Sequence, residues 1–325
     1  MFAYILRRLF YAIPILLGVN VLTFSLFFMV NTPDDMARMQ LGVKHVTPEA
    51  MERWKIERGY DRPLFWNASA SGLEKAKNTL FFTKSARMFW GDFGRAEDGR
   101  DIRREILSRA GPSLMLALPT FLLGLFVAVS FALLLAFFRA TALDFSGVAL
   151  CVALMSISSL FYIIGGQYLF AKLWRIAPIS GLGDGIDAWR FVFLPIVIGV
   201  ASAIGANARW YRTLFLEETE KEYVRAARAR GLSEPRIFFR HILKNAMIPI
   251  LTGVVAVIPS LFLGSLLMES FFGIPGLGSY TIDAIHAQDF PVVRAMVFIG
   301  SALYVAGLLL TDISYTLADP RIRFS

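Results

Sequence analysis

The chain has 325 residues, of which 56% are hydrophobic and 18% are charged, and it carries a formal net charge of +8. A soluble domain carries about 25% charged residues, so this composition argues against a water-soluble globular protein and indicates hydrocarbon as the solvent. The net positive charge does not indicate a nucleic-acid partner here, because the placement of the basic residues matters more than their sum. The single cysteine, Cys151, excludes an intrachain disulfide and a cysteine-based zinc or iron–sulfur site.

Membrane-spanning helices are the main prediction from the hydropathy pattern. A helix needs roughly 20 mostly apolar residues to cross a bilayer, and proline and glycine are tolerated within it. The first apolar run is too long for a signal-peptide core and lacks a small-residue cleavage pattern, so we expect it to remain as a span. Six stretches qualify or nearly qualify: about 9–30, 114–138, 148–173, 191–210, 248–268 and 292–310. The fold class predicted is therefore an all-α integral membrane protein with six transmembrane helices and an external insertion after the first.

The basic residues predict how these helices are oriented. Short loops rich in Lys and Arg stay in the cytoplasm. Basic residues precede the first span, follow the second and sixth, and gather between the fourth and fifth. These segments reach one side only if there are six spans and both termini are cytoplasmic. Residues 31–110, 174–190 and 269–291 then lie outside.

The external segment 31–110 contains several helix signals. Thr47 is a suitable N-cap, Pro48 suits the first helical position, and Gly59 suits the end of the helix that they begin. Residues 73–90 indicate another helix. Residues 101–109 indicate a short helix that precedes Gly111-Pro112. We expect a small external cap with too little apolar material for a large core of its own.

The loop after the fourth span predicts two helices joined by a sharp turn. Residues 217–230 are rich in helix-forming Glu, Lys, Ala and Arg, and Gly231 suits a left-handed residue that ends a helix. Ser233 suits the N-cap of a second helix that continues into the fifth span. The small residues Ala226 and Ala227 would let another protein approach closely. The residues alone leave open whether this basic loop binds a partner protein or lies on anionic headgroups.

Two polar residues near the predicted spans have alternative interpretations. Gln167 either joins helices by hydrogen bonds or lines a transport path. Glu269 is either a solvated end of the fifth span or a group that touches a substrate or gate. The spans show neither HExxH nor GxSxG, and the chain has no GxxxxGK[ST] phosphate loop, so we expect no catalytic residues, no metal site and no ATP site in this chain. The alternative function is an ion-coupled secondary transporter, but the first, second, third and fifth spans lack the central charges that such coupling usually needs.

The loop between the fourth and fifth predicted spans resembles a loop of a known protein family. Residues 222–245, EYVRAARARGLSEPRIFFRHILKN, resemble the EAA loop of ABC importer permeases, in the form found in the oligopeptide and dipeptide branch. Residues 90–94 (WGDFG), 269–278 (ESFFGIPGLG) and 319–323 (DPRIR) also resemble that branch, in the same order. The chain departs from the pattern at Arg225, which occupies the first acidic position. It also departs at 156–162, which lack the proline that usually interrupts the third span.

This resemblance implies a type I importer permease fold and a B-type permease subunit of the bacterial cytoplasmic (inner) membrane. Such a subunit would translocate peptides or similar small solutes that an external binding protein delivers. Its partners would be a homologous C-type permease, two cytoplasmic ABC ATPases that bind ATP and Mg²⁺, the substrate-binding protein and membrane lipids. We expect no nucleic-acid partner and no cofactor bound by this chain.

The resemblance also implies a division of the chain. The expected regions are a first helix (1–30), an external cap (31–110), a permease core (111–317) with a coupling loop (213–247), and a cytoplasmic tail (318–325). ATPase docking is expected within residues 217–246. The expected docking residues are Glu222, Tyr223, Arg225, Ala226, Ala227, Gly231 and Leu232. Gln167 and Glu269 are the expected residues of the substrate path.

Overall fold

The computed structural model describes residues 2–42 and 47–318, and all the regular structure in these ranges is helical apart from one isolated bridge between Arg95 and Asp101. The prediction of an all-α protein is confirmed. The expected tail, residues 318–325, lies outside the described residues except for Ala318.

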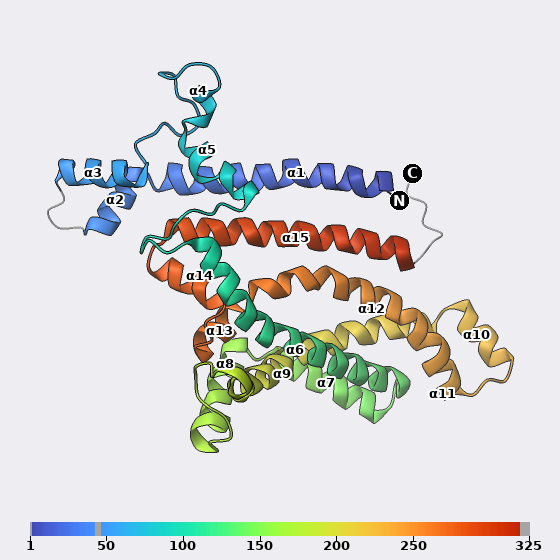
Figure 1. The fold of residues 1–325 in the computed structure, drawn as a ribbon. Coiled ribbons are helices and arrows are strands. Elements are labelled where there is room, and N and C mark those ends of the chain that lie inside the picture. Colours follow the sequence, from blue (N-terminus) through green and yellow to red (C-terminus); the bar gives the residue numbers. More distant parts are fainter. Residues whose placement is uncertain (1, 43–46, 319–325) are drawn as a thin grey trace. The chain divides into compact units, whose positions relative to one another are not determined.

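The chain divides into two compact units. The first contains residues 1–108 and 283–306, and the second contains residues 109–282 and 307–325. The first helix and the expected cap therefore fall in one unit together with 283–306, whereas the expected boundaries set them apart. The helices up to residue 90 (Figure 1) are α1 (Phe2–Ser25), η1 (Leu26–Val30), α2 (Pro33–Leu41), α3 (Pro48–Arg58), α4 (Glu74–Lys77), α5 (Leu80–Lys84) and η2 (Ala86–Trp90).

The remaining helices contain most of the apolar sequence. In chain order they are α6 (Ile102–Phe137), α7 (Ala142–Met155), α8 (Ser159–Gly166), η3 (Gln167–Leu173), η4 (Gly185–Asp187), α9 (Ala188–Thr219), α10 (Glu222–Ala229), α11 (Glu234–Ile237), η5 (Phe238–Ile242), α12 (Leu243–Val257), η6 (Ile258–Leu263), α13 (Leu266–Phe272), α14 (Leu277–His286) and α15 (Phe290–Ala318).

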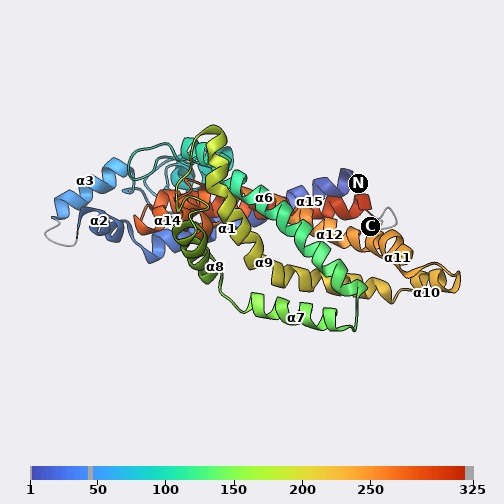
Figure 2. The ribbon, with the colours of Figure 1, turned by 90° about the horizontal axis from the view of Figure 1, so that it is seen from below.

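Five helical segments of the described chain are long and apolar enough to cross a membrane: Leu6–Val30, Ile102–Phe137, Gly185–Thr219, Glu234–Leu263 and Phe290–Ser314. The third predicted span is instead a pair of helices, Ala142–Met155 and Ser159–Leu173, bent by 86° (Figure 2). Counting this bent pair as one span gives the six that hydropathy predicts. Serines replace proline at the bend: the Ser156 hydroxyl donates to the Val152 carbonyl, and the backbone of Ser158 is extended.

Several local predictions can be compared with the helix ends. The Thr47 cap is confirmed, because its Oγ accepts from the Ala50 N–H at 3.3 Å, and Gly59 ends α3 in the left-handed conformation. The single helix expected over 73–90 is instead three short ones. The short helix expected over 101–109 is continuous with the second span, because α6 passes through Pro112 and Pro119. Each proline removes only one backbone donor, and an apolar environment favours keeping the other hydrogen bonds.

The segment that follows the first helix packs against the end of that helix. Phe24 and Phe28, which are almost fully buried, pack with Met36 of α2, Trp54 of α3 and Leu80 of α5. Burying aromatic side chains of this size is strongly favourable, so the segment after the first helix needs no large core of its own.

In the second unit, α7 lies alongside α9, as Figures 1 and 2 both show. The two helices approach closely at Gly205, where an added Cβ would lie 2.6 Å from the Cys151 carbonyl oxygen. Cys151 is itself buried at this contact, as expected for a small apolar residue.

Candidate functional site

The loop after α9 forms a helical hairpin, defined here as residues 220–242 and called the loop hairpin. The prediction of a single helix over 217–230 is wrong, because α9 ends at Thr219 and α10 begins at Glu222. Lys221 between them has an extended backbone, and the Tyr223 hydroxyl donates to the Glu218 carboxylate across the break at 2.6 Å. Burial and this hydrogen bond raise the pKa of Tyr223 to about 12, so the phenol stays a donor.

Gly231 makes the turn between the two arms, as predicted. Its φ is +76°, in the left-handed region that glycine adopts without a Cβ penalty. The Gly231 N–H donates to the Arg228 carbonyl at 2.9 Å, and the Leu232 N–H donates to the Ala227 carbonyl at 3.3 Å. This pair of hydrogen bonds is the Schellman arrangement, which satisfies carbonyls at a helix end.

The inner face of the loop hairpin belongs to a hydrophobic core. Val224 and Ala227 are almost fully buried and pack with Phe215, Ile237 and Ile242 in one cluster. Ala227 therefore does not face a partner, contrary to expectation, because α10 turns this position toward α9 and η5. Only Ala226 of the two alanines is exposed. Leu232 is half-buried and packs against the same core.

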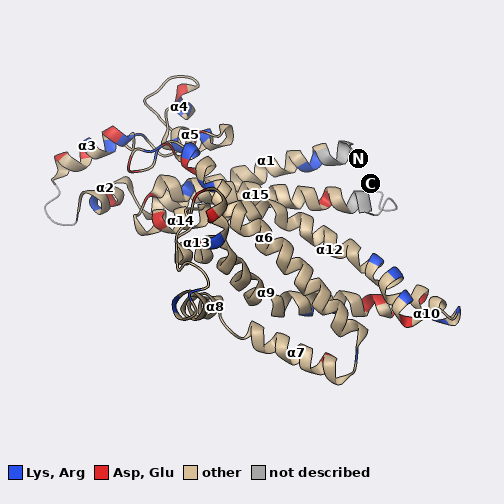
Figure 3. Cartoon of the chain, turned by 60° about the horizontal axis from the view of Figure 1, so that its bottom comes forward, with Lys and Arg blue, Asp and Glu red and all other residues tan. Residues whose placement is uncertain are grey.

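The outer face is charged, and the charges are concentrated around α10 (Figure 3). Glu222, Arg225 and Arg230 are exposed. The Arg228 guanidinium donates to both oxygens of Glu234, at 2.7 and 3.2 Å, and so joins the two arms. Both side chains of this pair are about half-exposed, so it orients the turn more than it stabilises the fold.

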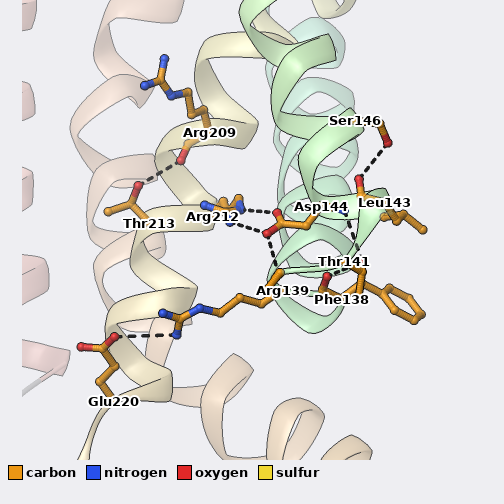
Figure 4. A network of polar contacts seen from close by, with 11 residues as sticks. Phe138, Arg139, Thr141, Leu143, Asp144, Ser146, Arg209, Arg212, Thr213 and Glu220 are labelled. Atoms are coloured by element: carbon orange, nitrogen blue, oxygen red, sulfur yellow. Dashed lines mark hydrogen bonds and ion pairs between the residues drawn. The ribbon is translucent and has the colours of Figure 1, made fainter.

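A largely buried ion pair joins α9 to the start of α7 (Figure 4). Arg212 of α9 donates through Nε and Nη2 to the two oxygens of Asp144, both at 2.8 Å. The Asp144 side chain, only 9% exposed, also accepts from the Ala140 N–H at 3.0 Å. Asp144 thus fixes both the α6–α7 turn and the α7–α9 contact.

The Asp144–Arg212 pair was not predicted from the sequence. A signal existed for Asp144, since Thr141-x-x-Asp144 matches the start of a helix with an acid at its third position. The Thr141 hydroxyl does cap α7. Nothing in the spacing pointed to Arg212 as its partner, 68 residues later.

A cavity of about 690 Å³ lies among α6, α8, α9 and the segment from η6 to α13. Every residue of its lining is uncharged. Many of its hydroxyls are already bonded within their own helices, for example Thr120 to the Leu116 carbonyl and Ser202 to the Gly199 carbonyl. Small and polar members of the lining include Gly124, Gly199, Asn207 and Ser265. The walls therefore offer space and weak polarity rather than a fixed charge.

Glu269 of α13 is fully buried, which corrects the expectation of a solvated span terminus. Its Oε1 accepts from the Ser113 hydroxyl at 2.8 Å and the Ser265 N–H at 3.1 Å. Its Oε2 accepts from the Gly278 and Ser279 N–H groups at 2.7 and 3.1 Å. We call these five residues the Glu269 node. Burial raises the pKa of Glu269 above its usual value, and all four donors act in the opposite direction.

The node depends on glycine, because a Cβ at Gly264 or Gly276 would collide with the Glu269 carboxylate. The Gly278 and Ser279 donors are in the first turn of α14, so the acid also satisfies the N-terminus of that helix. Neither Glu269 nor Gln167 lines the cavity. Gln167 donates to the carbonyls of Ile179 and Phe271, at 3.2 and 2.9 Å, which agrees with the alternative that it joins segments.

No group of three or more His, Cys, Asp or Glu side chains that could hold a metal occurs in residues 2–42 and 47–318.

Residues 102–324 match the family described as the binding-protein-dependent transport system inner membrane component, and residues 1–71 match its N-terminal region. The chain belongs to this family. This inner-membrane component is therefore a multi-pass subunit of an ABC transport system that works with a binding protein and ATPases, and it is not itself an enzyme.

Named relatives cover the whole chain. A putative peptide transport system permease protein of Brucella abortus is 32% identical over an alignment of 337 positions, which covers 100% of both chains. The oligopeptide transport system permease protein AppB of Bacillus subtilis is 28% identical over 341 residues, again with 100% of both covered. The dipeptide transport system permease protein DppB of Escherichia coli is 27% identical over 351 residues, with 99% of both covered. These relatives favour the importer over the ion-coupled alternative.

Proposed function

We propose that this inner-membrane component is the B-type permease subunit of an importer for peptides or similar small solutes, and that it pairs with a homologous C-type permease. One observation supports coupling between a partner ATPase and the transport path: the loop hairpin and the cavity use the same helices. Ala132 and Ala136 of α6 and Phe215 of α9 share a core with the hairpin, while residues 116–125 of α6 and 195–211 of α9 line the cavity.

The shared core supplies a mechanical path. Residues 125 and 132 of α6 are separated by about 10 Å of helix rise. A helix held by close-packed side chains moves as a unit rather than bending at each contact. A partner ATPase that pulls or pushes the exposed face of α10 would therefore move α6, α9 and η5 together. Closing of the two ATPases would then change the width of the cavity by a rigid-body motion.

The cavity suits peptide substrates that differ in their side chains. A wall without charge neither pairs with nor repels a peptide terminus strongly, and its small residues leave room. We expect selectivity to lie mainly in the binding protein that delivers the substrate.

The first test separates the two alanines of α10. Ala226→Trp places bulk on the exposed face and is expected to leave assembly intact, while it abolishes transport because the ATPase no longer seats. Ala227→Trp places the same bulk in the core and is expected to lower the yield of folded protein, since overpacking a core costs about 1–3 kcal/mol. Uptake into proteoliposomes and ATP hydrolysis are measured on the complete transporter. Full transport by Ala226→Trp would contradict docking at this face.

The second test concerns orientation. We propose that both termini and the loop hairpin are cytoplasmic and that residues 31–110 and 269–291 are external. Asp92 and Gln288 are exposed and suit replacement by cysteine, whereas Gly276 does not because a Cβ would collide with Glu269. A membrane-impermeant maleimide added to whole spheroplasts is expected to label Asp92→Cys and Gln288→Cys but not Arg236→Cys. The reverse pattern would overturn the topology. Cys151 is buried and provides a low background.

A further inference from the structure

A basic hollow lies where the bent third span ends and α9 begins. It has a volume of about 550 Å³ and is lined by Lys172, Arg175 and Arg190 together with residues 176–179 and Ala171. All three cations are exposed, and no lining residue is acidic. Within the described part of the chain, neither Lys172 nor Arg175 has a carboxylate within ion-pair distance. Arg190 has only Asp187, at 3.9 Å between two largely exposed side chains.

The backbone makes a fixed turn beside the basic hollow. The Trp174 and Ile176 N–H groups donate back to the Leu169 and Phe170 carbonyls, both at 2.9 Å, so the chain reverses at the end of η3. Arg175 takes part in this reversal with a φ of +54°, which is unusual for a residue with a side chain. Like charges gathered on one surface repel one another, so an anion that bound among them would lower their electrostatic free energy.

A second, apolar hollow of about 330 Å³ adjoins the first. Ile176, Ala177 and Arg190 line both hollows, and Trp189 and Phe193 complete the second. Trp189 and Phe193 are more than half exposed, at 52% and 58%. A ligand that fills both hollows therefore needs an anionic group beside an apolar chain.

The position of the two hollows restricts the class of ligand further. One candidate span ends at Leu173 and the next begins at Gly185, so the cations lie at the ends of two membrane helices. Headgroups occupy this level of a bilayer, and exposed tryptophan beside lysine and arginine is typical of it. We propose that Lys172, Arg175 and Arg190 bind the phosphate of an anionic phospholipid, with one acyl chain along Trp189 and Phe193. An acidic protein surface would complement the cations but would leave the apolar hollow unfilled.

Native mass spectrometry of the complete purified transporter, titrated with phosphatidylglycerol or phosphatidylcholine, tests this proposal. We expect the native transporter to retain phosphatidylglycerol in preference to phosphatidylcholine. One basic residue near an anionic lipid contributes about a fivefold change in affinity, so Lys172→Gln/Arg175→Gln/Arg190→Gln is expected to lower phosphatidylglycerol affinity about 100-fold. The matched control, Arg62→Gln/Lys77→Gln/Arg95→Gln, removes three other exposed cations and is expected to retain the lipid.

Two further variants test the apolar contact separately and provide a substitute for the triple variant. Trp189→Ala/Phe193→Ala keeps the charges and is expected to weaken retention by removing the acyl-chain contact. Arg175→Gln alone, expected to weaken retention about fivefold, replaces the triple variant if that variant does not assemble. Equal retention of both lipids by the native transporter, or equal phosphatidylglycerol retention by the triple variant and its control, would overturn the proposal. So would a triple variant that keeps its lipid but loses stimulation of ATP hydrolysis by the binding protein, which would assign the patch to an acidic protein.

Discussion

The loop hairpin and the Glu269 node are both helix–turn–helix connections of the second unit, but they are held in opposite ways. The hairpin buries Val224 and Ala227 and leaves its charges on the outside. The node buries a carboxylate and surrounds it with four donors. The first is stabilised by apolar contact, which tolerates small movements, and the second by hydrogen bonds, which do not.

This difference suggests different roles for the two turns. A segment that receives force from a partner benefits from a charged outer face and a continuous core beneath it. A turn that supports the cavity wall benefits from fixed geometry, and residues 264–268 of that wall lie directly before Glu269. The contrast predicts that damage to the node reduces stability, whereas damage to the hairpin reduces coupling.

The largest effect is expected at the node. Glu269→Ala leaves four donors without an acceptor and is expected to cost about 4 kcal/mol, roughly 1 kcal/mol for each donor. Ser113→Ala removes one donor to Glu269 and the acceptor of the Leu277 N–H, and is expected to cost about half as much. The loss of stability of both variants is measured by heating the purified transporter and using size-exclusion chromatography to determine the fraction that stays folded at each temperature. A melting temperature of Glu269→Ala equal to that of the native protein would show that the node is dispensable.

A somewhat smaller effect is expected at the ion pair of Figure 4. Arg212→Met leaves the Asp144 carboxylate buried without its partner and is expected to cost about 3 kcal/mol. The double variant Arg212→Met/Asp144→Leu removes both charges and is expected to recover most of that loss. Arg209→Met, one turn away and exposed, is the matched control. A double variant less stable than either single one would contradict the interpretation that charge compensation dominates.

The smallest stability effect, with the clearest functional effect, is expected at Gly231. Gly231→Val forces a β-branched residue into a left-handed conformation, at about 1–2 kcal/mol, although a Cβ there meets no neighbour. We expect insertion and assembly to persist while transport is uncoupled from ATP hydrolysis. Gly231→Asn is the control, because asparagine tolerates this conformation. Transport by Gly231→Val at the rate of the Asn variant would refute the role of the turn.

The sequence was sufficient to predict much of the fold and part of the site. Apolar runs of about 20 residues predicted the spans, because burial in hydrocarbon depends on composition alone. Local rules predicted the Thr47 cap and the left-handed Gly231, because both depend on a few neighbouring residues.

The remaining features depend on contacts between distant residues. The buried Glu269 requires Ser113, 156 residues earlier, and no spacing rule connects them. The inward orientation of Ala227 requires α10 to turn after Glu220, which is decided by the core of Phe215 and Ile242. The bend of the third span occurs at serines rather than at the proline that a rule would look for.

The Asp144–Arg212 pair has a consequence for biosynthesis. Arg212 is made 68 residues after Asp144, which at ribosomal rates corresponds to about 3–14 s. During that interval Asp144, at the start of an apolar helix, lacks the Arg212 guanidinium to which it is later bonded, and α7, with 14 residues, is too short to cross a bilayer by itself. We therefore expect the third span to reach its final place only after α9 has left the ribosome. Nascent chains arrested before Arg212 should leave α7 extractable from the membrane, and chains arrested beyond α9 should not.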